Sequence, residues 1–209
     1  MTKNSDDNAF SPEYLSSLEE NVLSELSSRE KNYTFRFNGL RRILSDVHQQ
    51  KLTRALERLQ EDNLIERHPD GGYQLEDNLY DRIREYYSKQ DRYFSYGKSN
   101  LENKKVFTSI SRDGNFPVKH LINRLSGKYF GDYRFIGHYY SEGRGQLEWI
   151  HAEDHSRILI STITPSKITM VTYDVSKSAI NKFLRILQQT LLDYQMVVPL
   201  TEEIMSQAN

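Results

Sequence analysis

The chain has 209 residues, of which 37% are hydrophobic, and this is enough apolar material for one large core or two smaller ones. Its 28 Lys and Arg residues are balanced by 29 Asp and Glu residues, so any contact with an anionic polymer must come from a local cluster of charge. The lack of cysteine excludes disulfides, thiolate nucleophiles and cysteine-based zinc sites.

The amino terminus is polar and acidic. Residues 1–10 contain no apolar segment, which predicts a disordered tail rather than a targeting sequence. No part of the chain approaches the ~20 consecutive apolar residues that cross a bilayer. We therefore expect a soluble cytoplasmic protein with no membrane partner.

The first helix is predicted to begin at Ser11 and to end near Ser28. Ser11, Pro12 and Glu13 follow the order of an N-cap, a first-turn proline and a first-turn acid. The apolar residues that follow at helical spacing are Leu15, Leu18, Val22 and Leu26. One face of this helix is therefore expected to pack into a core.

A short strand and a second helix come next. Residues 33–37 alternate apolar and polar side chains, which predicts a strand. Residues 39–44 are expected to form a short helix that is capped by Asn38 and ends at the turn formed by Ser45 and Asp46. The turn leads directly into a third helix.

The third helix is predicted to begin at Val47 or His48. Its apolar residues have the spacing i, i+3, i+4 and i+7, and they are Leu52, Ala55, Leu56 and Leu59. This stripe packs inward and leaves the opposite face in solvent. His48 occupies the usual place of a small capping residue, and Asp46 with Gln49 forms an alternative capping box.

A hairpin and a connecting helix follow the third helix. Residues 64–67 and 73–75 are two short strands around the turn at residues 69–72, Pro-Asp-Gly-Gly, which tolerates positive φ. Residues 79–100 are rich in tyrosine, and the stripe of Leu79, Ile83 and Tyr87 predicts a connecting helix and linker. The domain boundary is expected near the end of this segment.

Residues 101–209 are predicted to form a second, α+β domain. The expected strands cover residues 106–110, 133–140, 146–151, 157–164 and 167–173, and the expected helices cover residues 117–125 and 177–194. Their order is β-α-β-β-β-β-α. This topology is similar to one repeat of the TATA-binding-protein-like fold and, more loosely, to helix-grip ligand-binding domains. The likeness allows either an effector site between the sheet and the long helix or a dimer interface.

The amino-terminal elements have the order of a winged helix-turn-helix. Residues 47–56, Val-His-Gln-Gln-Lys-Leu-Thr-Arg-Ala-Leu, resemble the recognition helix of MarR-, ArsR- and GntR-like regulators. Residues 59–65 resemble the junction that leads to the wing, with Asn63 where these families often carry glycine. The resemblance implies a DNA-binding domain over residues 11–78, preceded by the tail.

The residue types on the third helix suit contact with duplex DNA. Gln50, Thr53 and Arg54 lie opposite the apolar stripe and can hydrogen-bond base edges. Between residues 36 and 60 there are six basic and two acidic residues, so positive charge is concentrated where phosphates would lie. The predicted DNA-contacting residues are Gln49, Gln50, Lys51, Thr53, Arg54, Arg58, Arg41, Arg42, Arg67 and His68.

The sequence thus predicts a sequence-specific transcriptional regulator that binds double-stranded DNA. Because one short helix reads only a few base pairs, we expect a homodimer on paired half-sites, with the connecting helix as its interface. A small-molecule effector is a further expected partner. The alternative is a winged-helix protein-interaction adaptor of the transcription machinery, since such domains also serve as protein-contact modules.

No catalytic site or cofactor site is predicted. The chain has no Ser-His-Asp order, paired-carboxylate motif or cofactor fingerprint, so we expect a protein that is not an enzyme and has no cofactor. His138, His151 and His155 offer a metal-binding alternative. However, the spacing of His151 and His155 falls across a strand end and a turn, where the two side chains need not converge, so no metal site is expected.

Overall fold

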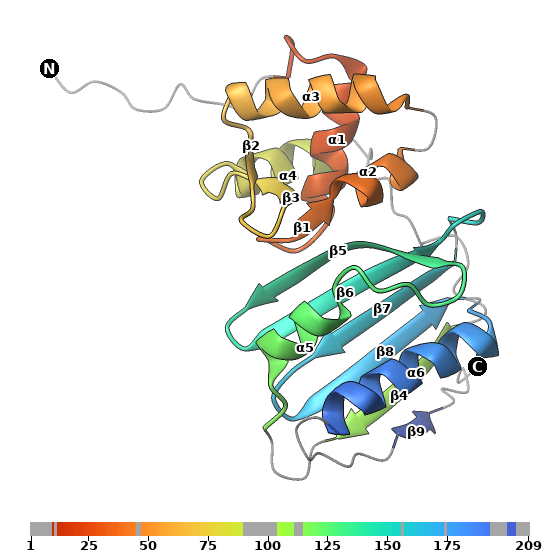
Figure 1. Cartoon of the computed structure of the whole chain (residues 1–209). Helices are drawn as coiled ribbons and strands as arrows, with labels where there is room; N and C mark the ends of the chain where they lie inside the picture. Colours follow the sequence, from red (N-terminus) through yellow and green to blue (C-terminus); the bar gives the residue numbers. More distant parts are fainter. Residues whose placement is uncertain are drawn as a thin grey trace, which may run out of the picture.

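A computed structural model of the chain describes residues 10, 12–44, 47–89, 104–110, 115–155, 157–173, 175–192 and 200–203. Within these residues the protein is a mixed α+β structure with six helices and one antiparallel sheet of nine strands (Figure 1). The helices are α1 (Ser17–Ser27), α2 (Phe37–Ile43), α3 (Gln49–Glu61), α4 (Tyr80–Lys89), α5 (Val118–Leu125) and α6 (Lys177–Leu192). The strands are β1 (Thr34–Arg36), β2 (Ile65–Arg67), β3 (Gly72–Leu75), β4 (Lys104–Ile110), β5 (Tyr133–Ser141), β6 (Arg144–His151), β7 (Ile158–Ile163), β8 (Lys167–Tyr173) and β9 (Leu200–Glu203).

The sheet runs through both halves of the chain, which we define as residues 12–89 and residues 104–203. Its strand order is β2-β3-β1-β5-β6-β7-β8-β4-β9, and β1 joins the halves because it pairs with β3 on one side and β5 on the other. Thr34 pairs with His138, and Phe35 pairs with Gly137. A Cβ atom at Gly137 would lie 2.5 Å from the carbonyl oxygen of Thr34, so glycine is what lets these two strands approach. The expected linker over residues 90–100 lies outside the described residues.

The first helix starts later than the sequence suggests. The prediction of a start at Ser11 is wrong, because residues 12–16 are not helical and the amide of Leu15 donates to the carbonyl of Pro12 in a turn. Ser16 is the N-cap instead. Its side chain accepts from the Glu19 amide at 3.4 Å while the Glu19 carboxylate accepts from the Ser16 amide at 2.7 Å. This reciprocal capping box decides where the helix begins.

The start of the second helix also differs from the prediction. α2 follows β1 directly, and its N-cap is Arg36, whose extended backbone forms the boundary without a side-chain hydrogen bond. Asn38, the expected cap, lies inside the helix, and its carbonyl accepts from Nη1 of Arg42 at 3.0 Å. The expected turn at Ser45 and Asp46 lies outside the described residues.

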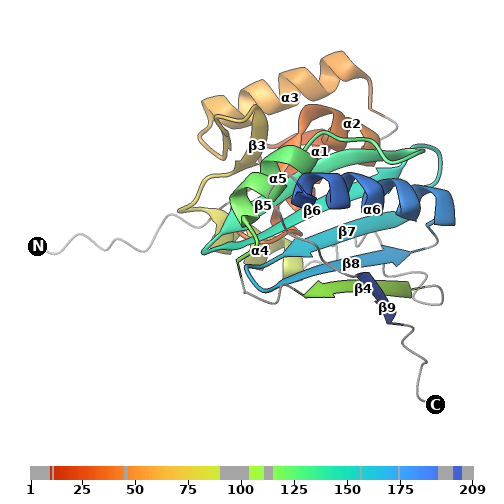
Figure 2. The same ribbon diagram turned by 60° about the horizontal axis from the view of Figure 1, so that its bottom comes forward.

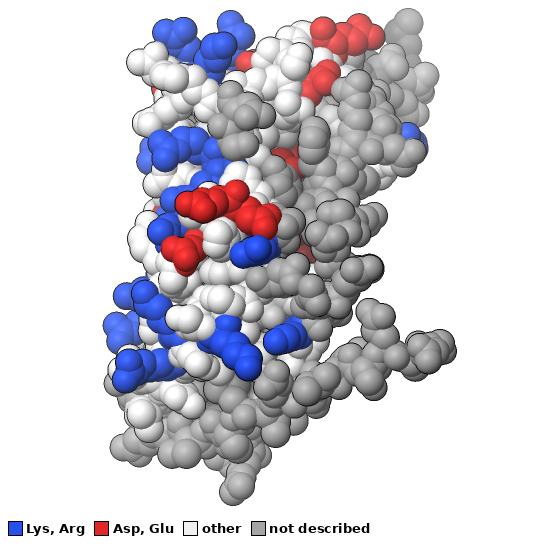
Figure 3. All heavy atoms as spheres, turned by 90° about the vertical axis from the view of Figure 1, so that its right-hand side faces the viewer, with Lys and Arg blue, Asp and Glu red and all other residues white. Residues whose placement is uncertain are grey.

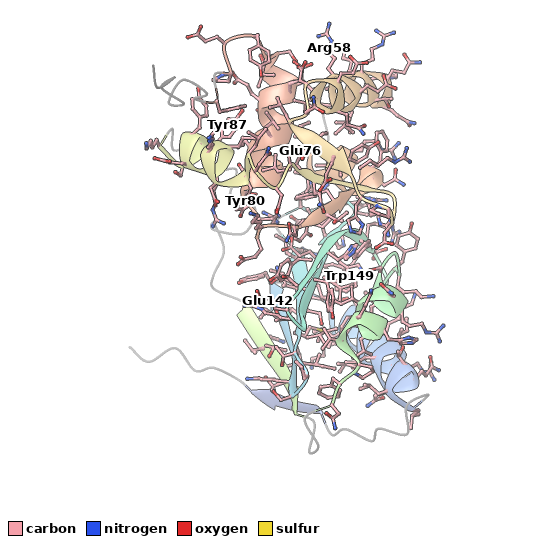
Figure 4. All side chains as sticks on the ribbon, turned by 90° about the vertical axis from the view of Figure 1, so that its left-hand side faces the viewer. Arg58, Glu76, Tyr80, Tyr87, Glu142 and Trp149 are labelled. Atoms are coloured by element: carbon pink, nitrogen blue, oxygen red, sulfur yellow. The ribbon has the colours of Figure 1, made fainter. Side chains whose placement is uncertain are left out.

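The amino-terminal half has a core made by α1, α3 and α4 together with one face of the sheet. The buried residues of this core include Val22, Leu23, Leu52, Leu56, Leu59, Ile83, Tyr87, Ile136, Ile150 and Ile158. The last three come from β5, β6 and β7, so the N-terminal helices pack on those strands. Tyr80 and Tyr87 of α4 point into this core (Figure 4). The apolar stripe of α4, expected at a dimer interface, is therefore buried within the chain.

The carboxy-terminal half follows the predicted order of elements and adds β9, which pairs with β4 and has no counterpart among the predictions. Both α5 and α6 cover the same face of the sheet (Figure 2). Trp149, Phe130 and Phe183 are fully buried beneath them and contact one another edge to face at 4.9 to 5.6 Å. Among the described residues, no helix is both long and apolar enough to cross a membrane.

A buried ionic contact also joins the two halves. Nε of Arg29, just after α1, lies 3.0 Å from Oε2 of Glu148 on β6; the Glu148 side chain is buried and that of Arg29 is 14% exposed. Desolvation alone would lower the pKa of the Arg29 guanidinium, but Glu148, followed by Tyr33 and Glu25, raises it above its usual value.

Candidate nucleic-acid interface

Helix α3 lies on the outer side of the amino-terminal half, away from the carboxy-terminal sheet (Figure 1). Its apolar stripe is at most 5% exposed, and the opposite face is in solvent. At about 100° per residue, the line opposite the stripe carries Gln50, Arg54, Glu57 and Glu61, all of which are exposed. The described part of the chain thus leaves this face open to a partner.

The charge on this exposed face changes along the helix. Lys51 and Arg54 lie in the first half of α3, while Glu57 and Glu61 lie in the second half. Neither Lys51 nor Arg54 has an ion pair within the described ranges. The amino-terminal half of α3 is therefore the part that can attract an anion.

Arg58 differs from these two basic residues because it faces α1. Its Nη1 lies 3.6 Å from Oε1 of Glu19, and the Arg58 side chain is 71% exposed while that of Glu19 is buried. Figure 4 shows Arg58 at the outer end of the molecule, far from Trp149. A groove of about 530 Å³ separates the start of α1 from α3. It is lined by Ser16, Leu18, Glu19, Lys51, Arg54, Ala55, Glu57, Arg58 and Glu61.

The beginning of α3 is held by polar contacts. His48 is the N-cap, and its Nδ1 accepts from the amide of Gln50 at 3.3 Å, so histidine replaces the small capping residue. The hydroxyl of Thr53 donates to the carbonyl of Gln49 at 3.1 Å. The side chain of Gln49 accepts from Nη1 of Arg41 at 3.2 Å, which connects α2 to the start of α3.

Arg41 and Arg42 extend the basic surface onto α2. Arg41 is exposed and Arg42 is half-buried. The pKa of Arg42 is lowered chiefly by desolvation, and Arg134 and Arg41 lower it further by repulsion, while Tyr129 acts in the opposite direction. Two of these neighbours, Tyr129 and Arg134, belong to the carboxy-terminal half, and no local sequence pattern connects them to α2.

The β2–β3 hairpin does not lie beside the exposed face of α3. It turns toward the carboxy-terminal half (Figure 1), where the ring centroid of His68 is 6.4 Å from that of His138. Nδ1 of His68 lies 3.4 Å from Oδ2 of Asp70 and accepts from the Asp70 amide. Arg67 is exposed at the end of β2. The structure therefore separates these two predicted contacts from those on α3.

A cavity of about 430 Å³ lies between the hairpin, β5 and α5. It is lined by Asn32, Thr34, His68, Asp70, Gln74, Lys119, Ile122, Asn123, His138 and Tyr140. Burial lowers the pKa of His138 to about 4, and Arg36 and His68 add to this shift while Asp70 opposes it. His138 is therefore neutral at physiological pH. This cavity is not in the place expected for an effector site, between the sheet and the long helix α6.

The histidines of the metal alternative do not converge. His151 pairs with Tyr133, which is five positions from His138 along β5, or about 16 Å at about 3.3 Å per residue. Nδ1 of His151 accepts from the amides of Glu153 and Asp154 in the following turn. No group of three metal-ligating side chains, with His155 or any other partner, occurs in the part of the chain that the structure describes.

Comparisons with protein families and with curated proteins find no match for this chain. The assignment of a function therefore depends on the arrangement of the side chains described above.

Proposed function

We propose that the chain is a sequence-specific regulator that binds double-stranded DNA through a winged helix-turn-helix formed by α1, β1, α2, α3 and the β2–β3 hairpin. The observation that carries this proposal is the exposed amino-terminal half of α3, where Gln50 is exposed and neither Lys51 nor Arg54 has an ionic partner among the described residues. A helix of this kind fits the major groove, which is wide enough to admit it.

The side chains on this half of α3 have complementary tasks. The amide of Gln50 can pair with an adenine edge, and the guanidinium of Arg54 can pair with a guanine edge. Lys51 and Arg41 carry positive charge without a carboxylate partner among the described residues, which suits contacts with phosphates. Thr53 already donates its hydroxyl proton to the helix backbone, so only its oxygen and methyl group remain for a base.

The hairpin plays a structural part in this proposal. His68 faces His138 and the cavity rather than α3, so we assign no base contact to it. Arg67 remains exposed and is assigned at most a backbone contact. A homodimer on two half-sites stays part of the proposal, because a single short helix reads only a few base pairs. Its interface lies elsewhere than the buried stripe of α4.

The test is selection of a binding site from random duplex DNA, followed by titration of two variants. We expect Arg54→Ala to lose preference at one base position, at a cost of about 1 to 3 kcal/mol. Lys51→Ala should weaken binding to all sequences equally and reduce the salt dependence. The matched controls are Arg185→Ala and Lys182→Ala on α6, which are exposed and should bind as wild type does. Wild-type protein with no salt-sensitive affinity for any duplex refutes the proposal.

One observation favours the alternative of a protein-binding adaptor. Glu57 and Glu61 place negative charge on the same exposed face of α3, where phosphates would repel them. An adaptor would bind a basic protein surface through these residues. Loss of partner binding in Glu57→Gln together with no duplex binding by the wild type would support this second function.

A further inference from the structure

Three arginines and one tyrosine from the two halves of the chain form a cluster that the proposed function does not yet use. Arg41 and Arg42 come from α2, Arg134 comes from β5, and Tyr129 comes from the segment between α5 and β5. The guanidinium carbon of Arg134 lies 5.1 Å from the centre of the Tyr129 ring. Tyr129 is 53% exposed, which makes it one of the most exposed large hydrophobic side chains among the described residues. We call these four residues the arginine cluster.

No carboxylate neutralises the arginines of this cluster within the described ranges. Arg41 donates to the side chain of Gln49, Arg42 to the carbonyl of Asn38 at 3.0 Å, and Arg134 to the carbonyl of Gly131 at 2.7 Å. The like charges act on one another, since Arg134 and Arg41 both lower the pKa of Arg42. Such a gathering of unpaired guanidiniums is a binding surface for anions, because a phosphate relieves the repulsion between them.

Close packing fixes the two parts of the cluster relative to one another. Gly39 of α2 lies directly against the backbone of Ile136 on β5, where a Cβ atom would be 2.2 Å from the Ile136 carbonyl oxygen. Arg134 is two positions from Ile136, and Arg41 and Arg42 are two and three positions from Gly39. The three arginines are therefore anchored on two elements whose backbones pack directly against each other.

The cluster is continuous with the start of α3. Arg41 contacts Gln49, the first residue of α3, so positive charge runs from that end of the helix across α2 and onto β5. On the face drawn in Figure 3, Lys and Arg side chains gather along one edge, and a group of acidic side chains lies beside them.

We propose that the arginine cluster is a phosphate-binding subsite through which the carboxy-terminal half holds the same duplex, next to the bases read by α3. This inference rests on the proposed function and adds a contact that a winged helix alone would not supply. Arg134 binds a backbone phosphate, and the ring of Tyr129 holds its guanidinium in position. Arg42, which is half-buried, follows Arg41 on α2 and extends the subsite from β5 toward α3.

The test uses the full chain with its selected duplex and measures affinity between 50 and 200 mM salt. We expect Arg134→Gln to weaken binding to selected and unrelated duplexes by the same factor. The slope of log K against log salt should become smaller by about one phosphate, or about 0.9. The preferred sequence should not change. Arg185→Gln, an exposed arginine on α6, is the matched control and should keep the wild-type slope.

The outcomes separate this inference from the proposed function. If the wild type binds its site and Arg54→Ala alters its base preference, while Arg134→Gln keeps the wild-type affinity and slope, the subsite is refuted and the proposed function stands. If the wild type binds no duplex, both fail. Because Arg134 is partly exposed and has no carboxylate partner among the described residues, thermal unfolding of Arg134→Gln should match the wild type. Tyr129→Ala gives a second variant that should reproduce part of the loss in affinity.

Discussion

Glu25 is a buried carboxylate on α1 whose two oxygens have no hydrogen-bond partner in the described structure. Burial raises its pKa to about 7, Arg29 opposes the shift, and Glu148 adds to it. A raised pKa means that the folded protein holds a proton that the unfolded chain releases near pH 4.5. The contribution of Glu25 to stability is therefore greatest below pH 4.5 and is lost as pH rises through about 7.

The raised pKa of Glu25 predicts how the stability of Glu25→Gln depends on pH. Glutamine does not titrate, so we expect the variant to gain stability over the wild type as pH rises from 5 to 8, by roughly 1 to 3 kcal/mol at the upper end. Urea unfolding of both proteins at a series of pH values measures this difference. His138 also titrates, but it is present in both proteins and cancels. Parallel pH curves for the two proteins would show that Glu25 titrates normally.

At the scale of the element, the contact between α2 and β5 depends on one glycine. Gly39→Ala would place a Cβ atom 2.2 Å from the Ile136 carbonyl oxygen, so the helix must move away from the strand. Alanine favours the helix by about 1 kcal/mol, but overpacking costs about 1 to 3 kcal/mol or more, and the clash here is with backbone that cannot rotate aside. We therefore expect net destabilisation.

The matched control is Asn38→Ala, one residue earlier in α2, where the side chain is exposed. It should be neutral or slightly stabilising, because alanine is the better helix former and no packing is lost. Chemical denaturation of the two variants measures the difference. If Gly39→Ala and Asn38→Ala unfolded at the same denaturant concentration, α2 could move away from β5 without loss of stability.

At the scale of the whole molecule, the continuous sheet predicts that the two halves unfold together. Leu56 is buried in the amino-terminal core, while Trp149, the only tryptophan in the sequence, is buried in the carboxy-terminal core. We expect Leu56→Ala to lower the unfolding free energy by about 2 to 5 kcal/mol, as is usual for such a truncation. Because β1 links the cores, Trp149 fluorescence should report the whole of this loss.

The control for this experiment is Gln60→Ala on the partly exposed side of the same helix, which should leave the Trp149 transition unchanged. Suppose that Trp149 fluorescence gives Leu56→Ala the same unfolding midpoint as the wild type, while circular dichroism shows a separate, earlier transition. The two halves would then unfold independently of each other.

The sequence by itself determined those helices and strands that leave a local pattern in the chain, such as periodic apolar residues or turn residues. The period of the apolar residues located α3 and the long helix α6, and turn residues located the hairpin and the strands of the second half. The exposed positions of Gln50 and Arg54 follow from the same period. The starts of α1 and α2 were predicted at the wrong residues, because the caps are Ser16 and Arg36 rather than Ser11 and Asn38, and the choice among possible caps depends on how the neighbouring chain packs.

Only the tertiary structure decided which residues from distant segments of the chain come into contact. The pairing of Thr34 with His138 turns the hairpin toward the carboxy-terminal half, and it takes His68 away from the face of α3. The packing of Gly39 on Ile136 brings Arg134 to the arginines of α2. Such contacts form between residues far apart in the chain, where burial and close approach of backbones decide the outcome, and no periodic pattern in the sequence records them.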